Sequence, residues 1–450
     1  MRFRLHKSKV VQVFMISMFI GMSFASGTNF DESDLSNNDY VLALFYESTS
    51  GETLDHGIIS SWYMDPVRWQ EVYIRQEIFD ISRQNKGDLI QLNVFDDRIL
   101  TGTISDVVEY IKGTKTVYGS INEAFYGTFV IAITDDTCLI TIRIPSEREL
   151  FITQFDSTSN VHYTVELDIN LYRDEPYAGP LIPPVEDELS DDGIHDTFNE
   201  KAPTSLDALN SQTNTNIDVM IVYTPEAKTW ANQAGGGINN VVSTAMANSQ
   251  IVLDNSQTYV TMRLVYSGVV NYEESGDNGL DLNRFTFGFG NMSEVHEWRD
   301  QYGADLVKLL TRSGNYGGVA WLPRSAQGSP DLGFSLTRVH LAAMTYTPIH
   351  EMGHNMGCHH HKQQNFQPGP GIFSYAAGWR WTGNDSLPFP YYCTVMTYTS
   401  GVYFADGRTH TQVPYFSNPN VQYEGFPTGH SFHGDNARTI REIRHVISSY

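Results

Sequence analysis

The sequence predicts two folded regions of different class: an all-β-rich region that ends near residue 173 and an α/β (α+β) region over residues 217–450. In the first region, short apolar runs alternate with clusters of Asp, Gly, Ser and Asn, which is typical of antiparallel strands and turns. In the second region, strand-like runs alternate with helical patterns. Between them, residues 174–200 contain four prolines and nine acidic residues with no Lys or Arg. Such a segment cannot bury a core, so we expect residues 174–216 to be a linker; an acidic loop over a basic neighbouring surface is the alternative.

The N-terminus has the order of a secretory signal peptide. Basic residues up to Lys9 precede a short apolar run, and small residues follow up to Ala25. An apolar run of about fifteen residues is short of the roughly 20 that a transmembrane helix needs, which disfavours the alternative of a membrane anchor. We therefore expect residues 1–25 to be removed, and the protein to be secreted (extracellular) and not to bind membranes.

Five runs predict the strands of the β-rich region, DLIQLNVF, GTFVIAIT, CLITIRI, LFITQF and HYTVELDI. Residues 26–87 precede them as a mixed segment. Acidic side chains are concentrated in this half of the chain, because residues 26–214 hold 34 Asp and Glu against 11 Lys and Arg, whereas residues 215–450 hold 18 against 14. Neither half offers the basic face that nucleic acid requires.

The α/β region begins with NIDVMIVYT, a buried strand, followed by helical sequence over residues 225–256 that glycines interrupt. TMRLVYSGVV predicts a second strand, MSEVHEWRDQYG an amphipathic helix and ADLVKLLT a third strand. YGGVAWLP is short and apolar with a glycine pair, which fits an edge strand. Such a strand can bind an extended peptide by backbone pairing, or can simply be an edge blunted by its glycines and proline.

Residues 350–361 read HEMGHNMGCHHH. His350 and His354 are four residues apart, so on a helix their imidazoles share one face and can bind one metal ion. Glu351 lies beside the first of them, where its carboxylate can take a proton from water that the metal activates. Gly357 can adopt the left-handed backbone that ends a helix, which lets His360 return to the same ion. Three imidazoles with an open fourth position form a catalytic zinc site.

The neighbours of this motif are expected to play lesser parts. His359 and His361 do not fit the spacing, and we expect them to be solvated loop residues or neighbours of the ligands. Thr347 before Pro348 fits the start of the helix, with Thr as the N-cap. The acidic residues show no EF-hand spacing, so a calcium ion has no motif to support it.

HEMGHNMGCHH resembles the extended zinc signature of the metzincin metalloproteases. YYCTVMTY resembles their methionine-containing turn, with Met396 beneath the zinc and Tyr398 in the position that approaches the metal in some members. NIDVMIVYTPEA, GADLVKLL, YGGVAWL and YFSNPNVQYEGFPTGHSFHGDNAR resemble secreted bacterial reprolysin-like metalloendopeptidases, including the peptidyl-Asp type. Two departures stand out: His361 follows the third histidine where these relatives usually have Asp, and the segment ahead of the helix, RVHLAAMTY, lacks the cysteine that relatives often have there.

The resemblance implies a zincin/metzincin catalytic domain over residues 217–450, with a twisted mixed sheet and a zinc-binding helix. It implies that His350, His354 and His360 hold one catalytic Zn²⁺, that Glu351 is the general base and that Tyr398 stabilises the oxyanion. It also implies a proenzyme, in which residues 26–173 are the propeptide and activation cleavage falls within 174–216. The expected partners are protein or peptide substrates, and the released domain is expected to be monomeric.

Two other functions stay open. One is a zinc-binding or adhesion module that has lost catalysis, which an intact Glu351 disfavours. The other is a metal hydrolase of non-peptide esters or amides, against which the methionine turn and the edge strand favour peptide.

Several residues near the site have two interpretations each. Cys358 and Cys393 form a disulfide between the third ligand's loop and the methionine turn, or are buried small apolar residues. Cys138 is a strand residue, or a thiolate that caps the zinc of the proenzyme. Arg408 and His410 form the wall of the specificity pocket and favour an acidic side chain, or are lone surface residues.

Overall fold

The computed structural model describes residues 42–45, 66–75, 78, 84–124, 126–157, 159–169, 213–383 and 390–450. The predicted signal peptide, residues 1–25, lies outside the described residues. The same is true of the predicted linker up to residue 212. Residues 41–450 form one compact unit.

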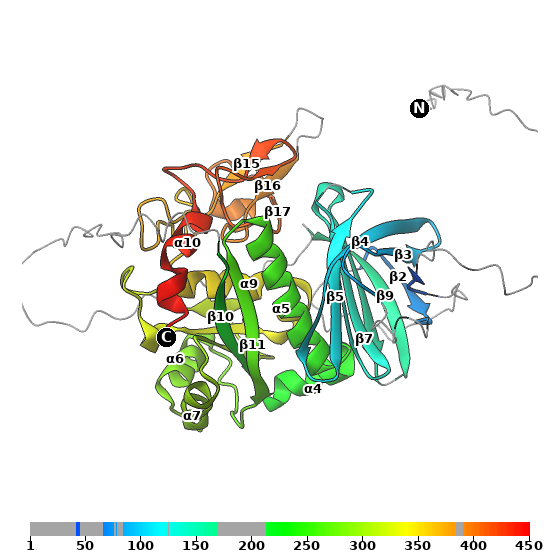
Figure 1. Cartoon of the computed structure of the whole chain (residues 1–450), viewed down its shortest axis with the longest axis horizontal. Coiled ribbons are helices and arrows are strands. Elements are labelled where there is room, and N and C mark those ends of the chain that lie inside the picture. The colour runs from blue at the N-terminus through cyan, green and yellow to red at the C-terminus, as the bar shows by residue number, and fades with distance from the viewer. Residues whose placement is uncertain are drawn as a thin grey trace, which may run out of the picture. The chain divides into compact units, whose positions relative to one another are not determined.

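The first part of this unit is an antiparallel sheet (Figure 1). Its short strand β1 pairs in parallel with β3. Its strands in spatial order are β1 (Leu42–Ala43), β3 (Leu89–Phe95), β4 (Arg98–Ile111), β5 (Thr114–Ile121), β6 (Thr128–Thr134), β7 (Thr137–Ile144), β8 (Glu149–Asp156), β9 (Val161–Asp168) and β2 (Arg68–Val72). We call β1–β9 the N-terminal sheet. The five predicted strands are confirmed as β3, β6, β7, β8 and β9, whereas β1, β2, β4 and β5 were not predicted. Most of β4 is only half-buried and carries charged residues, so the apolar pattern of its sequence is weak. Hydrogen bonding to β3 and β5 holds this segment as a strand instead.

The second part contains a five-stranded mixed sheet in the order β11 (Val260–Val269), β10 (Thr215–Tyr223), β12 (Leu306–Thr311), β14 (Phe334–Arg338) and β13 (Gly318–Ala320). All neighbours are parallel except β13, which pairs antiparallel with β14 at one edge. The prediction of an α/β domain with a mixed sheet and an edge strand at GGVAWL is therefore confirmed, although β14 was not foreseen.

Helices cover this sheet, and smaller elements follow it (Figure 1). The helices are α4 (Pro225–Ala234), α5 (Ile238–Asn255), α6 (Asn278–Phe287), α7 (Ser293–Tyr302), α8 (Val339–Met344), α9 (Thr347–Asn355) and α10 (Asn436–Ile447). Three 3₁₀ turns are at Pro145–Glu147, Pro330–Leu332 and Gly401–Tyr403, and the small strands are β15 (Arg380–Thr382), β16 (Tyr391–Cys393), β17 (Thr411–Gln412), β18 (Gln422–Tyr423) and β19 (Phe426–Pro427). The glycine break predicted within 225–256 separates α4 from α5, where Gly236 and Gly237 have φ of 71° and 104°.

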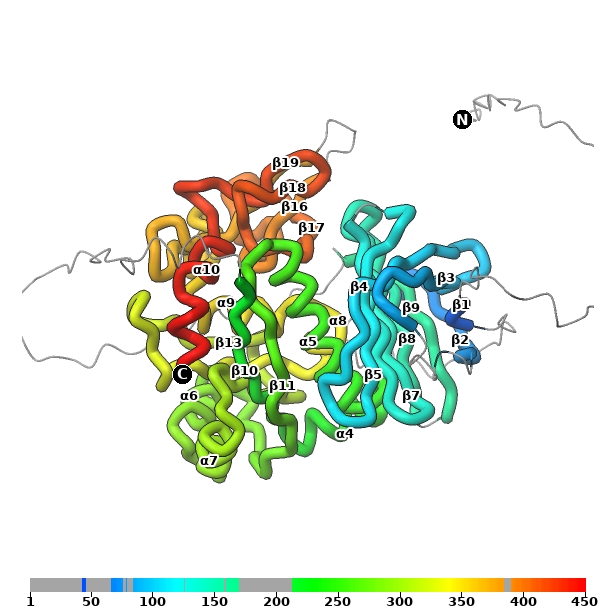
Figure 2. The backbone as a smooth tube through the Cα atoms, in the orientation of Figure 1, coloured from blue at the N-terminus to red at the C-terminus, as the bar shows by residue number. Residues whose placement is uncertain are grey.

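One apolar cluster joins the two sheets through α4 and α5. It contains Leu139 and Val165 of the N-terminal sheet, Ala231 of α4 and Val241 of α5. At the other end of the chain, α10 lies beside β10 (Figure 2), and the Arg444 guanidinium donates to the Thr215 hydroxyl at 3.1 Å. Of the helices in the described part of the chain, none is long and apolar enough to cross a membrane.

Candidate active site

The site is built on α9 and the loop after it. Thr347 is the first residue of α9 and Tyr346 is its N-cap, so the prediction of Thr347 as the cap is wrong by one residue, while Pro348 does lie in the first turn. The helix ends at Asn355. Gly357 has φ of 77°, and the Cys358 amide donates back to the Gly353 carbonyl at 3.0 Å. The predicted left-handed turn at Gly357 is therefore confirmed, and it reverses the chain so that His360 faces the helix.

The three predicted ligands meet at their Nε2 atoms. The Nε2 of His350 lies 3.2 Å from that of His360 and 3.1 Å from that of His354, and the His354–His360 distance is 3.1 Å. All three side chains are buried. Nitrogens about 2.0–2.1 Å from a tetrahedral zinc ion lie roughly 3.3–3.4 Å from one another, so the triangle has nearly the size that a zinc ion requires.

The hydrogen-bond partners of the three Nδ1 atoms determine whether the three Nε2 atoms carry protons. Each Nδ1 faces a backbone carbonyl: His350 faces Val395 at 2.7 Å, His354 faces Cys358 at 2.9 Å and His360 faces Gln367 at 3.0 Å. Because a carbonyl oxygen only accepts, each Nδ1 is the donor and each Nε2 presents a lone pair to the other two. Burial lowers the pKa of His350 to about 4 and also lowers the pKa values of His354 and His360. Three converging lone pairs without a proton are the donor set of a metal cation.

Glu351 lies beside this triangle with a carboxylate that is fully buried. Neither of its oxygens has a hydrogen-bond partner among the residues that the structure describes. Burial raises the pKa of Glu351 to about 8, and the charge of Lys308 acts in the opposite direction. The carboxylate packs against Gly318 of the edge strand, where an added Cβ would come within 2.5 Å of Oε1. Glu351 is thus a buried acceptor on α9, packed against the strand β13.

Lys308 was missed in the sequence analysis. It lies on β12, is fully buried, and its ammonium donates to the Thr337 hydroxyl at 3.1 Å. Burial lowers its pKa to about 7. The signal for it was a charge in the middle of the apolar run LVKLLT, which is unusual for a central parallel strand.

The predicted methionine turn lies against α9. A Cβ added at Gly353 would meet the Met396 sulfur at 2.8 Å, and the Val395 carbonyl accepts from His350. The ring of Tyr398 is buried, with its centroid 4.6 Å from that of His360 and 6.4 Å from that of His350. Met396 therefore contacts α9 and Tyr398 lies beside two of the predicted ligands, while the catalytic role of Tyr398 stays a prediction.

The histidines beside the third ligand are buried, so the interpretation of His359 and His361 as solvated residues is wrong. The Nδ1 of His359 accepts from the His360 amide at 2.7 Å. His361 packs against Trp379 and Phe404. Both are neighbours of the ligands.

The predicted disulfide is also wrong, because Cys358 and Cys393 are both free. The Cys358 thiol lies 3.5 Å from the Asn436 carbonyl on α10, whereas the Cys393 thiol lies 3.9 Å from the Thr397 carbonyl within the methionine turn. Cys138 is a buried residue of β7, and burial raises the pKa of its thiol. The strand interpretation of Cys138 therefore holds over the metal-capping thiolate.

Arg408 and His410 line a pocket of about 390 Å³ together with His361, Lys362 and Arg380. Arg380 is the most enclosed cation: its side chain is 9% exposed, it donates to Asp406 at 2.9 Å and to His410 Nε2 at 3.1 Å. Burial and the charge of Arg380 lower the pKa values of His361 and His410 to about 4. The pocket is lined by the cations Arg380, Arg408 and Lys362 and by the carboxylate of Asp406. His410 is buried and is therefore not a surface residue, whereas Arg408 is exposed as the second interpretation expects.

Residues 213–400 match the family model of metallo-peptidase family M12. This part of the chain is therefore similar to the M12 metallopeptidases of the reprolysin type. Three peptidyl-Asp metalloendopeptidases resemble it. Those of Stenotrophomonas maltophilia and Xanthomonas campestris are each 29% identical, over 53% and 52% of this chain and 54% and 51% of their own length. That of Pseudomonas aeruginosa is 26% identical over 52% of this chain and 40% of its own. The chain thus spans about half the length of these relatives.

Among solved structures, one titled "Structure of a chaperone-substrate complex" aligns over 71% of this chain and 38% of its own, with a TM-score of 0.38 and 12% identity. The part of the chain that matches the M12 family brings His350, His354 and His360 together, and their roles, with those of Glu351 and Tyr398, stay predictions. It also uses Asn355, which the sequence analysis missed, to tie α9 to the sheet: the Asn355 amide donates to the carbonyls of Trp321 and Phe334 at 2.9 and 3.0 Å.

Proposed function

We propose that the protein is a secreted zinc endopeptidase that is made as a proenzyme and whose M12 domain hydrolyses peptide bonds of protein substrates. The observation that carries this proposal is the convergence of three unprotonated Nε2 atoms beside a buried, unpartnered carboxylate. This donor set fits zinc, and it leaves the fourth position open for chemistry.

His350, His354 and His360 would hold the zinc ion, which supplies a Lewis acid for the scissile carbonyl and for water. Glu351 receives a proton from the attacking water and passes it to the leaving amine. Its geometry supports this role, because neither carboxylate oxygen has a hydrogen-bond partner among the described residues and both can accept. Tyr398, whose ring packs on His360, is the candidate donor to the developing oxyanion.

The edge strand β13 supports binding of an extended peptide. It is the outer strand of the sheet and its Gly318 touches Glu351. A substrate strand that pairs with β13 would bring its backbone past the general base. This favours a peptide over a small ester or amide.

The pocket around Arg380 and Arg408 supports a preference for acidic side chains beside the scissile bond. Its cations face a cavity next to His361, the neighbour of the third ligand. The similarity to peptidyl-Asp metalloendopeptidases points in the same direction.

The N-terminal sheet supports the proenzyme. It packs on α4 and α5 of the M12 domain through one apolar cluster. We infer that residues 26–173 are a propeptide, that cleavage within 174–216 releases the M12 domain, and that residues 1–25 direct secretion.

The test of the mechanism is Glu351→Gln. The variant is expected to keep one zinc ion per chain and to lose about 10²–10⁴-fold in kcat, the contribution of a general base. Glu442→Gln is the matched control, since Glu442 is a buried carboxylate that accepts from the Tyr375 hydroxyl on another face. Near-normal turnover in Glu351→Gln contradicts the mechanism. A wild-type protein that binds zinc but cleaves only esters, or nothing, favours one of the two alternative functions.

The test of the pocket is Arg408→Gln with a peptide library. Hydrolysis of Asp-containing peptides is expected to fall about tenfold relative to the corresponding Asn peptides. The control is Arg324→Gln, because Arg324 is an exposed arginine that pairs with Asp331 outside the pocket. This variant should change the hydrolysis of neither the Asp peptides nor the Asn peptides. An unchanged Asp-to-Asn ratio in Arg408→Gln contradicts the assignment.

A further inference from the structure

The third ligand is held differently from the other two. His350 and His354 lie on α9, whose backbone hydrogen bonds fix their positions, whereas His360 follows the helix on a loop. The loop must be held by contacts from elsewhere in the chain if all three Nε2 atoms are to stay within 3.2 Å of one another.

The peptide group between His359 and His360 is held on both sides. Its carbonyl, that of His359, accepts from the Gly378 amide at 2.9 Å and from the Asn436 side-chain amide at 3.1 Å. Its N–H, that of His360, donates to the His359 ring at 2.7 Å. Because a peptide group is planar, fixing both its ends fixes the direction in which the His360 Cα leaves it.

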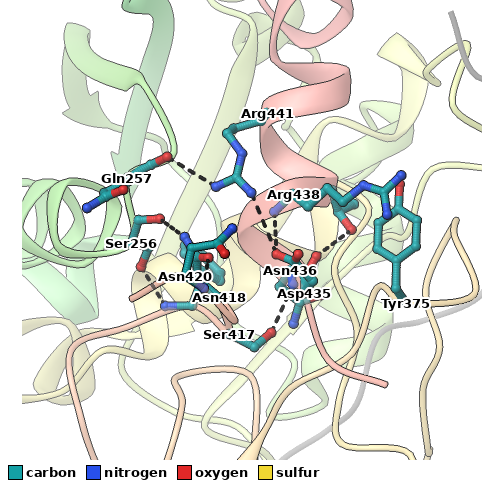
Figure 3. A network of polar contacts seen from close by, with 12 residues as sticks. Ser256, Gln257, Tyr375, Ser417, Asn418, Asn420, Asp435, Asn436, Arg438 and Arg441 are labelled. Atoms are coloured by element: carbon teal, nitrogen blue, oxygen red, sulfur yellow. Dashed lines mark hydrogen bonds and ion pairs between the residues drawn. The ribbon is translucent and has the colours of Figure 1, made fainter. Parts of the chain in front are cut away.

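Asn436 is placed to make this contact by residues on two other segments (Figure 3). Its backbone amide donates to the Ser417 hydroxyl at 2.8 Å, and that hydroxyl donates to the Ala377 carbonyl at 2.7 Å. Asp435 is the N-cap of α10 and accepts from the Arg438 amide at 2.9 Å. Asn436 is fully buried, and only its NH₂ group can face the His359 carbonyl, so its orientation is unambiguous.

A second bond ties the same residue to the loop, since the Cys358 thiol lies 3.5 Å from the Asn436 carbonyl. Asn436 thus touches two residues of the ligand-bearing loop. The stretches SNPN and GDNAR, which the resemblance to reprolysin-like enzymes singled out, meet at this point.

We infer that Asn436 is a positioning residue for the third zinc ligand. Its amide holds the His359–His360 peptide so that the His360 imidazole completes the triangle before the metal arrives. This inference rests on the proposed zinc site. Without the amide, the His359 carbonyl keeps only the Gly378 bond, the loop gains freedom, and the metal must order it on binding.

The test measures zinc affinity of the full chain by chelator competition, together with the visible spectrum of the Co²⁺-loaded protein. Asn436→Ala is expected to weaken zinc binding about 10–100-fold, the usual effect of losing a group that orients a ligand. Asn436→Asp keeps the volume but turns an oxygen toward the His359 carbonyl, and is expected to weaken it at least as much. Asn418→Ala is the matched control: Asn418 is a buried asparagine of the same network whose amide donates to the Ser256 carbonyl at 2.9 Å, away from the ligands. It should lower the melting temperature and leave zinc affinity unchanged.

A double-mutant cycle separates positioning from general stability. If Asn436 acts through His360, then Asn436→Ala has no further effect on zinc affinity once His360→Ala has removed the ligand. Additive losses in the cycle, or a zinc affinity of either Asn436 variant within threefold of wild type, overturn the inference. Failure of the zinc-loaded wild type to cleave peptides would refute the proposed function and leave this result intact, because the readout is metal binding.

Discussion

Gly318→Ala tests how closely the edge strand holds the general base. The added Cβ would lie 2.5 Å from Glu351 Oε1, 2.7 Å from its Cγ and 2.8 Å from its Cδ. An ordinary contact needs about 3.4 Å or more, so the carboxylate must move by roughly 1 Å, and a misplacement of that size costs about 10²-fold in rate. Glu351 is enclosed on a rigid helix and cannot turn away into solvent. We therefore expect kcat to fall about 10²-fold.

The zinc ion should remain, because the three histidines are held by the carbonyls of Val395, Cys358 and Gln367 and not by Gly318. The assay is cleavage of a fluorogenic peptide with zinc content and melting temperature measured on the same preparation. Overpacking of this kind also costs about 1–3 kcal/mol of stability.

Gly317→Ala is the control for that cost. Its Cβ would meet only the Leu341 Cδ1 at 2.8 Å, the end of a flexible side chain. It should lose stability and keep most of its kcat. The reasoning is refuted if Gly318→Ala, fully loaded with zinc, retains kcat within threefold of wild type, or if Gly317→Ala loses as much.

Three further predictions concern the metal and the proenzyme. His360→Ala should lose the most zinc affinity in chelator competition, His359→Ala less because its ring only accepts from the His360 amide, and His361→Ala least; equal losses would mean that the wrong third ligand was chosen. Zinc affinity should change less than about threefold from pH 7.5 to 5.5, because burial lowers the pKa of His350 to about 4. Protons then compete with zinc for the imidazole only near pH 4 and below. Three histidines with ordinary pKa values near 6.5 would lose up to about 10³-fold over the same interval, and a loss of that size would contradict the site's electrostatics. N-terminal sequencing of the active secreted species should give a start within residues 174–212, because Thr215 already belongs to β10; an active chain that begins near Ser26 would make the N-terminal sheet a permanent domain.

The sequence determined what depends on local backbone geometry. The four-residue spacing of His350 and His354 implies one helical face, and the left-handed turn needs only Gly357. The alternating and continuous apolar runs identified five strands of the N-terminal sheet and the strands β10, β11, β12 and β13. A strand buried on one face alternates apolar and polar residues, and a strand buried on both faces is apolar throughout. Half-buried strands such as β4 carry no such pattern and became visible only through their pairing partners.

The tertiary structure decided what depends on segments far apart in the chain. Sheet order brings Lys308 and Gly318 to Glu351, and the path of the last helix brings Asn436 to the His359 carbonyl, 77 residues away. The same long-range packing turned the Cys358 and Cys393 thiols toward different carbonyls and gathered Arg380 and Arg408 around one pocket. A one-dimensional pattern names residues that can serve a site; which of them touch is set by how the strands are ordered and where the loops run, and no local spacing encodes that.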